Sequence, residues 1–490
     1  MEGVTWVAIS LYSFNDPENH MHQDIQTYDL LVIGSGPAGK AAAIQAAKIG
    51  RRAAIVDGQV QIGGVCVHTG TVPSKTLRET VLNLSGWRER GFYGRSYRAK
   101  QNISAADLME RVDITLQNEV DILEHQLTRN HVDILHGHAR FIDDQTVEVD
   151  PGSGELHCVK AQKMIIAVGT KTYRPDNIPF NGHSIIDSDE VLKMQTLPRS
   201  LTVIGAGVIG VEYATIFRAL DVNVTLVEPR DTMLDFVDAE VIRYFQHDLI
   251  DNGLRVQFGQ KVSEISPRKN GGAVVRMENG RAIASDVVLF AAGRVGATTD
   301  LGLDKIGIEI DHRNRIKVDE YFRSSKENIY AAGDVIGFPS LASTSLEQGR
   351  IAALHALDQP VHKAPEYFPY GIYSVPEISS VGMTEESVIE HKIPYEIGVA
   401  PLRETSRGRV MGLQSGLMKT IFSLKTKRLL GVHIVGEGAT ELIHIGQAVL
   451  TLKGSLNYFL ENVFNYPTLA EAYKVAALDA HNRIVAAEAN

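Results

Sequence analysis

The sequence predicts an α/β protein with two Rossmann-like dinucleotide-binding domains and a C-terminal α+β domain. Two segments, 28–57 and 201–228, each read as a short apolar strand, a glycine turn, a helical pattern and a second strand. From about Tyr367 the pattern changes to strands followed by helices. The chain has 490 residues, which is more than a single hydrophobic core usually serves. Several domains are therefore expected.

Composition excludes some classes of protein. The chain is 44% apolar and 22% charged, as in ordinary globular proteins, and its net charge of -10 argues against a nucleic-acid partner. No apolar run reaches the roughly 18 residues of a membrane span, so we expect no membrane partner, and no metal site is expected. The two cysteines, Cys66 and Cys158, cannot form a secreted disulfide framework and favour the reducing cytoplasm. Residues 1–27 are interpreted as a poorly ordered extension without a signal peptide.

The remaining elements follow from local patterns. Residues 103–127 form an amphipathic pattern that predicts a long helix with Ser104 as its N-cap. Residues 132–150 predict a set of short strands, and Cys158 is expected to be a buried strand residue without a role. Near the C-terminus, strands are predicted within 371–388 and 416–436, and helices within 440–454 and 469–485.

The first glycine turn, "GSGPAG", contains Gly34, Gly36 and Gly39. The first permits the sharp turn, the second lets a pyrophosphate approach the backbone, and the third lets helix and strand pack closely. The amides at the start of the helix then face the phosphates. Asp57 lies 18 residues after Gly39, where it can accept hydrogen bonds from an adenosine ribose.

The second turn, "GAGVIG", contains Gly205, Gly207 and Gly210, with Glu228 again 18 residues further on. One such fingerprint is a weak signal, but two copies in the same context are specific. A chain with two sites most economically binds one flavin and one nicotinamide dinucleotide, so the expected cofactors are FAD and NAD(P).

Another stretch, "NIYAAGDVIGFPSLA", places Gly333 and Asp334 after a short apolar strand. Asp334 can hydrogen-bond the ribityl chain of a flavin. It can equally be the N-cap of the following helix, and the sequence leaves both alternatives open.

These motifs, together with "GGVCVHTGTVPSK", "IIAVGT", "AAGRVG" and "NYPTLAEAY", resemble the flavoprotein family of lipoamide dehydrogenase, glutathione reductase and mercuric reductase. The likeness runs from about Tyr28 to Asn482. It implies an FAD-binding and central domain over 28–169 and 294–363, an NAD(P)-binding domain over 170–293, and a C-terminal dimerisation domain over 364–490. A homodimer or larger homo-oligomer is expected.

The chain departs from the disulfide reductases of that family at two positions. Cys66 matches their first redox cysteine, but Thr71 stands where the second cysteine, which lies against the flavin, should be. Tyr466 replaces the histidine base, so Glu471 lacks the partner that it would orient. Tyr466 could close the site across a dimer interface or simply pack there. Disulfide reduction is therefore not expected.

The family resemblance also assigns site residues. It implies that Lys75 lies beside the reactive flavin nitrogen and pairs with Glu212, and we expect these two to be catalytic. A structural ion pair is the alternative. The resemblance implies further FAD contacts from Gly64, Cys66, Thr71, Lys75 and Gly169, and an NAD(P) contact from Gly293.

Within the family the chain looks most like the pyridine nucleotide transhydrogenase branch, which similarly has threonine in place of the second cysteine. That resemblance implies ping-pong hydride transfer between NADPH/NADP+ and NADH/NAD+ through FAD. Glu228 favours NAD, whereas Arg230 could neutralise the 2′-phosphate of NADP or merely pair with Asp231 or Asp235. Alternatives are an NADH oxidase or diaphorase, a dihydrolipoamide dehydrogenase-like protein without disulfide reductase activity, and a flavin-binding regulator. Cys66 is either a reactive thiol or, as we prefer, a packed relic.

Overall fold

The computed structural model describes residues 25–488. Most of the expected N-terminal extension, residues 1–24, lies outside this range. The first strand, β1, covers Gln26–Ile33, so it begins two residues inside the segment that we assigned to the extension. A difference of this size is common at the ends of elements.

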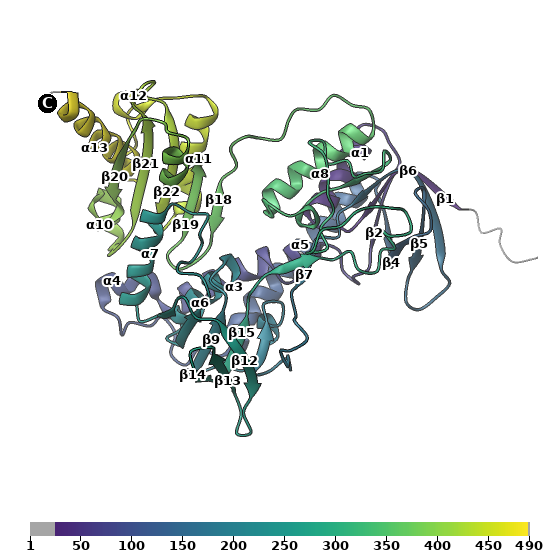
Figure 1. Ribbon diagram of the computed structural model, residues 1–490, viewed down its shortest axis with the longest axis horizontal. Coiled ribbons are helices and arrows are strands. Elements are labelled where there is room, and N and C mark those ends of the chain that lie inside the picture. Colours follow the sequence, from purple (N-terminus) through teal and green to yellow (C-terminus); the bar gives the residue numbers. More distant parts are fainter. Residues whose placement is uncertain (1–24, 489–490) are drawn as a thin grey trace, which may run out of the picture.

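The first sheet has the order β3-β2-β1-β6-β5-β4, and β17 also pairs with β6 (Figure 1). Strands β1, β2, β3, β6 and β17 are parallel, while β4 and β5 form an antiparallel ribbon. The bounds are β2 Ala53–Asp57, β3 Asp133–His136, β4 His138–Phe141, β5 Thr146–Asp150, β6 His157–Ile166 and β17 Ile329–Ala331. Every residue of β2 is buried, as expected of a parallel strand covered on both faces.

Two helices from distant parts of the chain pack side by side on this sheet (Figure 1). They are α1, Pro37–Lys48, and α8, Ala342–Ala356. A Cβ atom on Gly349 would lie 2.0 Å from the carbonyl oxygen of Ala38, so glycine is required for this approach. The segment between the sheet strands contributes α2 Gly64–His68, α3 Thr71–Ser85, α4 Arg90–Tyr93 and α5 Ala105–Arg129. Ser104 caps α5 in a full capping box with Asp107, which confirms the predicted N-cap.

The second sheet is parallel throughout, with the order β11-β10-β9-β15-β8. Its strands are β8 Ile185–Asp187, β9 Ser200–Ile204, β10 Asn223–Val227, β11 Arg255–Gln257 and β15 Val287–Phe290. Helices α6 Val208–Ala219 and α7 Ala239–Asp251 connect its strands. The antiparallel strands β12 Val262–Pro267, β13 Ala273–Met277 and β14 Ala282–Ser285 form a small sheet beside it, and β7 Thr170–Thr172 pairs with β16 Arg294–Gly296.

The C-terminal region is an antiparallel sheet with the order β18-β19-β22-β21-β20, accompanied by helices (Figure 1). Its strands are β18 Tyr370–Ile372, β19 Ile378–Gly382, β20 Tyr395–Pro401, β21 Leu417–Ser423 and β22 Leu429–Val435. Its helices are α9 Glu385–Glu390, α10 Ser406–Met411, α11 Ala439–Thr451, α12 Leu456–Glu461 and α13 Glu471–Glu488. The fold class is therefore confirmed, with two parallel α/β units and an α+β ending.

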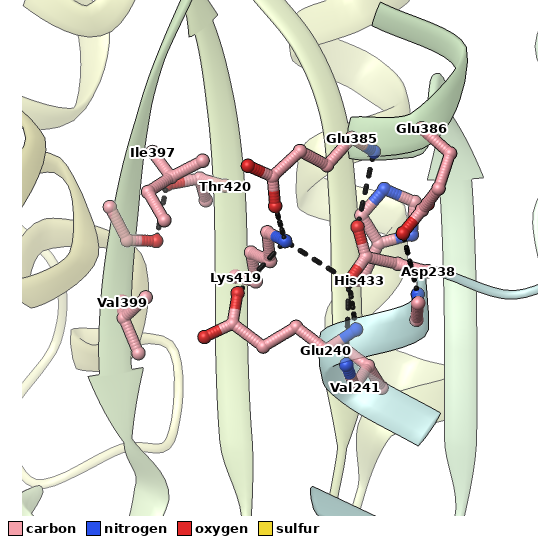
Figure 2. Close-up of polar contacts among 12 residues, drawn as sticks. Asp238, Glu240, Val241, Glu385, Glu386, Ile397, Val399, Lys419, Thr420 and His433 are labelled. Carbon is pink, nitrogen blue, oxygen red and sulfur yellow. Dashed lines mark hydrogen bonds and ion pairs between the residues drawn. The ribbon is translucent and has the colours of Figure 1, made fainter. Parts of the chain in front are cut away.

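A buried ion cluster joins the second unit to the C-terminal sheet (Figure 2). Lys419 of β21 is 0% exposed and contacts three carboxylates, those of Asp238, Glu240 and Glu385. Asp238 also caps α7 by accepting hydrogen bonds from the amides of Glu240 and Val241. The ammonium of Lys419 therefore holds the start of α7 against the sheet.

His433 of β22 lies beside this cluster and is fully buried (Figure 2). Its Nε2 faces the carbonyl oxygen of Met383 at 2.9 Å. Burial lowers the pKa of His433, so the ring is neutral at pH 7.

Two smaller observations complete the fold. Cys158 lies in β6 as predicted, but it is half-buried rather than buried, because it occupies the exposed start of that strand. Within residues 25–488, the structure contains no helix with both the length and the apolar character of a membrane span.

Candidate functional site: two dinucleotide cradles and the wall between them

The first glycine turn connects β1 to α1. Gly34 has φ +105°, and a Cβ atom there would lie 2.4 Å from the carbonyl oxygen of Ala167. A Cβ on Gly39 would lie 1.8 Å from the carbonyl oxygen of Gly34, so only glycine permits this packing of helix on strand. Around Gly36, in contrast, a Cβ would meet no atom of the described chain within 4 Å. This open backbone is what a pyrophosphate needs to approach the helix N-terminus.

Asp57, at the end of β2, holds this turn in place. Its Oδ2 accepts hydrogen bonds from the Ser35 amide at 2.8 Å and from the Ser35 hydroxyl. The Ser35 hydroxyl in turn accepts a hydrogen bond from the Gly63 amide at 2.7 Å. The expected ribose acceptor thus has a second task, which is to fix the phosphate turn to the start of α2.

The second turn, between β9 and α6, repeats this geometry. Gly205 has φ +103°, with a Cβ position 2.7 Å from the carbonyl oxygen of Ala291. The Cβ position of Gly210 is 1.9 Å from the carbonyl oxygen of Gly205. Gly207 again faces open space within the described chain. Glu228 accepts a hydrogen bond from the amide of Ala206 at 2.6 Å, as Asp57 does from Ser35.

Arg230 lies over Glu228. Its Nε donates to Glu228 Oε1 at 2.8 Å, and its Nη1 donates to Asp235 Oδ2 at 2.7 Å. Burial by itself would raise the pKa of Glu228, but the hydrogen bonds from Arg230 and from the Ala206 amide outweigh burial and keep that pKa below its usual value. The sequence left open that Arg230 pairs with a neighbouring acid, and the structure shows this pairing with Asp235. It also shows a second pairing, with Glu228, that was not expected.

The two turns belong to two adjoining cavities. One has a volume of about 1370 Å³ and is lined by the second turn, Glu228 and Arg230. The other has a volume of about 1070 Å³ and is lined by the first turn, Asp57, Gly64 and Gly169. Residues common to both linings, among them Thr71, Asp189 and Asp334, form a shared wall. Both cavities exceed the usual size for a small ligand and fit a dinucleotide each. The glycine cradles, with their exposed helix amides, match its pyrophosphate.

Lys75 and Glu212 meet in the larger cavity, which both of them line. Lys75 Nζ donates to both carboxylate oxygens of Glu212, at 2.9 and 2.8 Å. Glu212 also accepts the amide hydrogen of Tyr373 at 2.9 Å, and the Lys75 ammonium lies 4.9 Å from the centre of the Tyr373 ring. Lys75 comes from α3, Glu212 from α6 and Tyr373 from the segment after β18, so all three parts of the fold contribute to this point.

Gly333 and Asp334 follow β17; Gly333 lines the smaller cavity, and Asp334 belongs to the shared wall. Gly333 has φ +82°, and its amide donates to the Gln348 side chain at 2.9 Å. Burial raises the pKa of Asp334. Asp334 is the first residue of a 3-10 turn whose N-cap is Gly333, and it caps no helix. The N-cap alternative is therefore wrong, because α8 starts only at Ala342, eight residues further on. Gly293, at φ +125°, lines the larger cavity.

Cys66 and Thr71 flank the loop between α2 and α3. Both cysteines of the chain are free, and Cys66 lines only the smaller cavity, whereas Thr71 lines both. Burial raises the pKa of the Cys66 thiol, although Thr71 and the charge of Lys40 act in the opposite direction. A thiol with a raised pKa is protonated at neutral pH and is a poor nucleophile.

Tyr466 and Glu471 lie in the C-terminal region. Tyr466 is exposed and accepts a hydrogen bond from the Ser406 hydroxyl at 2.7 Å. Glu471 accepts the amide hydrogen of Ser406 at 3.2 Å. In place of the histidine that it would orient in the reductases, Glu471 thus binds the start of α10.

Sequence reasoning missed two further residues, Asp189 of the shared wall and Arg294, which lines the larger cavity. Arg294 pairs with Asp189 at 2.9 Å, and its other nitrogens contact Thr170. Asp189 lies on the loop after β8, far from any glycine motif, so the sequence carries no local signal for it.

Comparison with known proteins agrees with this geometry. Residues 28–349 match the sequence profile of the pyridine nucleotide-disulphide oxidoreductases, and residues 368–477 match the dimerisation domain of the same proteins. The chain belongs to this family.

Individual members of the family can be placed beside the chain. It is 48% identical over 461 residues to a soluble pyridine nucleotide transhydrogenase of Mycobacterium bovis, covering 94% of this chain and 98% of that one. A protein of the same name from Escherichia coli is 40% identical, covering 93% and 98%. Among solved structures, LpdA of Mycobacterium tuberculosis superposes with a TM-score of 0.84 at 25% identity, covering 93% and 99%. The flavoprotein disulfide reductase RclA of Escherichia coli superposes with a TM-score of 0.83 at 27% identity, covering 92% and 99%.

Proposed function

We propose that the chain is a flavin-dependent NAD(P)+ transhydrogenase, which moves hydride between NADPH/NADP+ and NADH/NAD+ without a redox disulfide. The observation that carries this proposal is the pair of cradles on a common wall, with Thr71 in that wall. Relatives with the name soluble pyridine nucleotide transhydrogenase support the same conclusion.

The smaller cavity would hold FAD, and the chemistry supplied by the bound flavin would be reversible hydride transfer with either coenzyme. Gly34, Gly36 and Gly39 would hold its pyrophosphate, Asp57 its ribose and Asp334 its ribityl chain. The larger cavity binds NAD(H) and NADP(H) in turn through Gly205, Gly207 and Gly210, with Gly293 beside them. One site that serves two coenzymes in succession produces ping-pong kinetics.

Lys75 would supply positive charge in the larger cavity, one helical turn along α3 from Thr71 of the shared wall. Its ammonium is kept in position by both oxygens of Glu212, and Glu212 is fixed by the Tyr373 amide. A fixed cation stabilises negative charge that develops on an isoalloxazine ring during hydride transfer. Lys75 and Glu212 are thus assigned to catalysis.

The route to a disulfide is missing in this proposal. Thr71 offers a hydroxyl, which cannot carry two electrons as a thiol does, and Tyr466 cannot act as the histidine base. We further propose that the protein acts in the cytoplasm, as a homodimer or larger homo-oligomer formed through the C-terminal region, with domain limits near residues 170, 294 and 364.

Anaerobic spectroscopy tests the function directly. The purified holoprotein receives NADPH, and NAD+ is added once the yellow flavin absorbance has fallen. The expected result is recovery of that absorbance together with NADH, identified by chromatography. Recovery only after oxygen or a quinone is admitted would instead support an oxidase or diaphorase. Lipoamide and glutathione disulfide serve as negative controls, and turnover of either would contradict the argument from Thr71 and Tyr466.

A further inference from the structure

Arg230 alone does not give the adenosine end of the larger cavity enough positive charge to bind a phosphate. Arg230 is shared by two carboxylates, Glu228 at 2.8 Å and Asp235 at 2.7 Å. These three groups together carry one net negative charge. A 2′-phosphate adds between one and two more, so it needs a cation that is not already neutralised.

Lys261 lies at the rim beside Glu228. The Glu228 amide donates to Gln257 at 3.0 Å, and the Gln260 amide donates back to the Glu228 carbonyl at 3.1 Å. The Gly259 amide binds the Arg230 carbonyl at 3.0 Å in the same ladder. Lys261 is the next residue along, and it lines the same cavity as Glu228 and Arg230.

The charge of Lys261 is uncommitted. Across residues 25–488, its ammonium forms neither an ion pair nor a hydrogen bond. Lys75 and Arg294, which also line the cavity, are paired with Glu212 and Asp189. Arg313 and Arg315 line it too, but they lie away from Glu228: the Arg313 carbonyl accepts the amide hydrogen of Gly296 in β16 at 2.8 Å, and Arg315 lies beside Gly337, near the flavin cradle. Lys261 is therefore the available cation at the Glu228 rim.

We propose that Lys261 binds the 2′-phosphate of NADP(H), while Arg230 clamps Glu228; this inference rests on the proposed use of both coenzymes. Ribose hydroxyls of NAD(H) face Glu228, and the flexible stem of Lys261 turns to solvent when no phosphate is present. Glu278, on the same rim, opposes it in charge, and its amide binds the Lys261 carbonyl at 2.9 Å. One pocket can then accept both coenzymes without rearrangement of the Glu228–Arg230 pair.

The kinetic test compares variants that change one charge. In Lys261→Gln, the KM for NADP(H) should rise about tenfold or more, because a charged hydrogen bond is lost. The KM for NAD(H) should move less than twofold. Lys261→Arg should restore most of the affinity, and Glu278→Gln should lower the KM for NADP(H). Lys269→Gln is the matched control, since Lys269 is exposed on the β12–β13 turn and lines neither cavity.

A binding test separates this inference from the proposed function. Calorimetric titration of each holoprotein uses 2′,5′-ADP, which carries the 2′-phosphate, and 5′-AMP, which lacks it. Lys261→Gln should weaken 2′,5′-ADP at least tenfold and spare 5′-AMP. If that loss occurs in a protein that exchanges no hydride, phosphate binding by Lys261 is supported and the proposed transhydrogenase function is wrong. If hydride is exchanged and Lys261→Gln behaves like Lys269→Gln, or if only Arg230→Gln weakens 2′,5′-ADP, the assignment to Lys261 is overturned.

Discussion

Lys75 and Lys419 are both held by carboxylates across an interface between parts of the fold, and yet they differ in what surrounds them. Lys75 has one carboxylate partner, is 26% exposed and faces a cavity of about 1370 Å³. Lys419 has three carboxylate partners, is 0% exposed and faces only protein. An ion pair by itself therefore does not identify a site. What separates the two cases is that Lys75 faces a cavity that a ligand can enter, whereas Lys419 does not.

The largest effect is expected where the lysine is closed in. Lys419→Met leaves the buried carboxylate of Asp238 and the partly buried carboxylates of Glu240 and Glu385 without their cation, so the free energy of unfolding should fall by about 3–5 kcal/mol. Hydride transfer per folded molecule should remain within a few-fold of wild type. Denaturant unfolding measures the first quantity. Lys425→Met, at an exposed position in the loop after β21, is the matched control and should change stability by less than about 0.5 kcal/mol.

Lys75→Met should reduce activity strongly and stability only a little, which is the opposite of Lys419→Met. Hydride transfer should slow by about 100-fold, or ~2.7 kcal/mol of barrier, because a fixed positive charge in the larger cavity, close to the shared wall, is lost. Stability should fall less than in Lys419→Met, since Glu212 keeps the Tyr373 amide and water reaches the site. Anaerobic stopped-flow of flavin reduction is the measurement. Equal losses of activity in the two lysine variants, per folded molecule, would remove the distinction between them.

Lowering the pH should reduce the free energy of unfolding, because His433 is buried beside the Lys419 cluster. Burial lowers the pKa of this histidine, so below about pH 6.5 the unfolded chain takes up a proton that the folded chain refuses. Stability then falls with decreasing pH, by up to about 1.4 kcal/mol per pH unit for this group. Unfolding curves at pH 7, 6 and 5 would show the slope, and His433→Gln should flatten it. An unchanged slope in that variant would assign the acid sensitivity to other groups.

At still lower pH the carboxylates of the same cluster add to this loss. Burial opposes ionisation of Asp238 and Glu385, but the ammonium of Lys419, with the Glu385 amide on Asp238 and the Tyr395 hydroxyl on Glu385, outweighs burial and keeps both pKa values below their usual range. Their stabilising contribution is complete above the unfolded pKa, near 4, and disappears as the pH falls through the folded values.

The smallest effect is expected at Cys66. Since burial raises the pKa of its thiol, Cys66→Ser should leave hydride exchange within a few-fold of wild type. Steady-state assay of both coenzymes measures this. A loss of two orders of magnitude would mean that the thiol takes part in the reaction.

The sequence predicted those parts of the molecule that depend on local geometry. The glycine turns were recognisable because Gly34, Gly39, Gly205 and Gly210 occupy places where a Cβ atom would collide with backbone. The fold class followed from the strands and helices that these turns connect. Resemblance supplied the pairing of Lys75 with Glu212, which lie 137 positions apart.

Contacts without a local pattern were not predictable. In "GLMKTIFS", Lys419 reads as the polar member of a half-exposed strand, and yet it is buried against Asp238, 181 positions away. Glu471 binds the start of α10, and Asp189 enters the shared wall from a loop. Arg230 looked available for a phosphate until its bonds to Glu228 and Asp235 were seen, because the two-residue spacing alone does not fix the direction of a side chain.

The dual task of the acid at each glycine turn has a consequence for coenzyme engineering. Glu228 is bonded to the Ala206 amide as well as to Arg230, just as Asp57 is bonded to Ser35. Exchange of Glu228 for a small residue would remove a repulsive charge, which favours NADP(H). It would also loosen the loop that cradles the pyrophosphate, so the affinity for both coenzymes would fall. Glutamine keeps an acceptor for that amide and is the better substitution. Rim residues outside this bond, such as Lys261, can be varied to redirect coenzyme choice while the cradle stays intact.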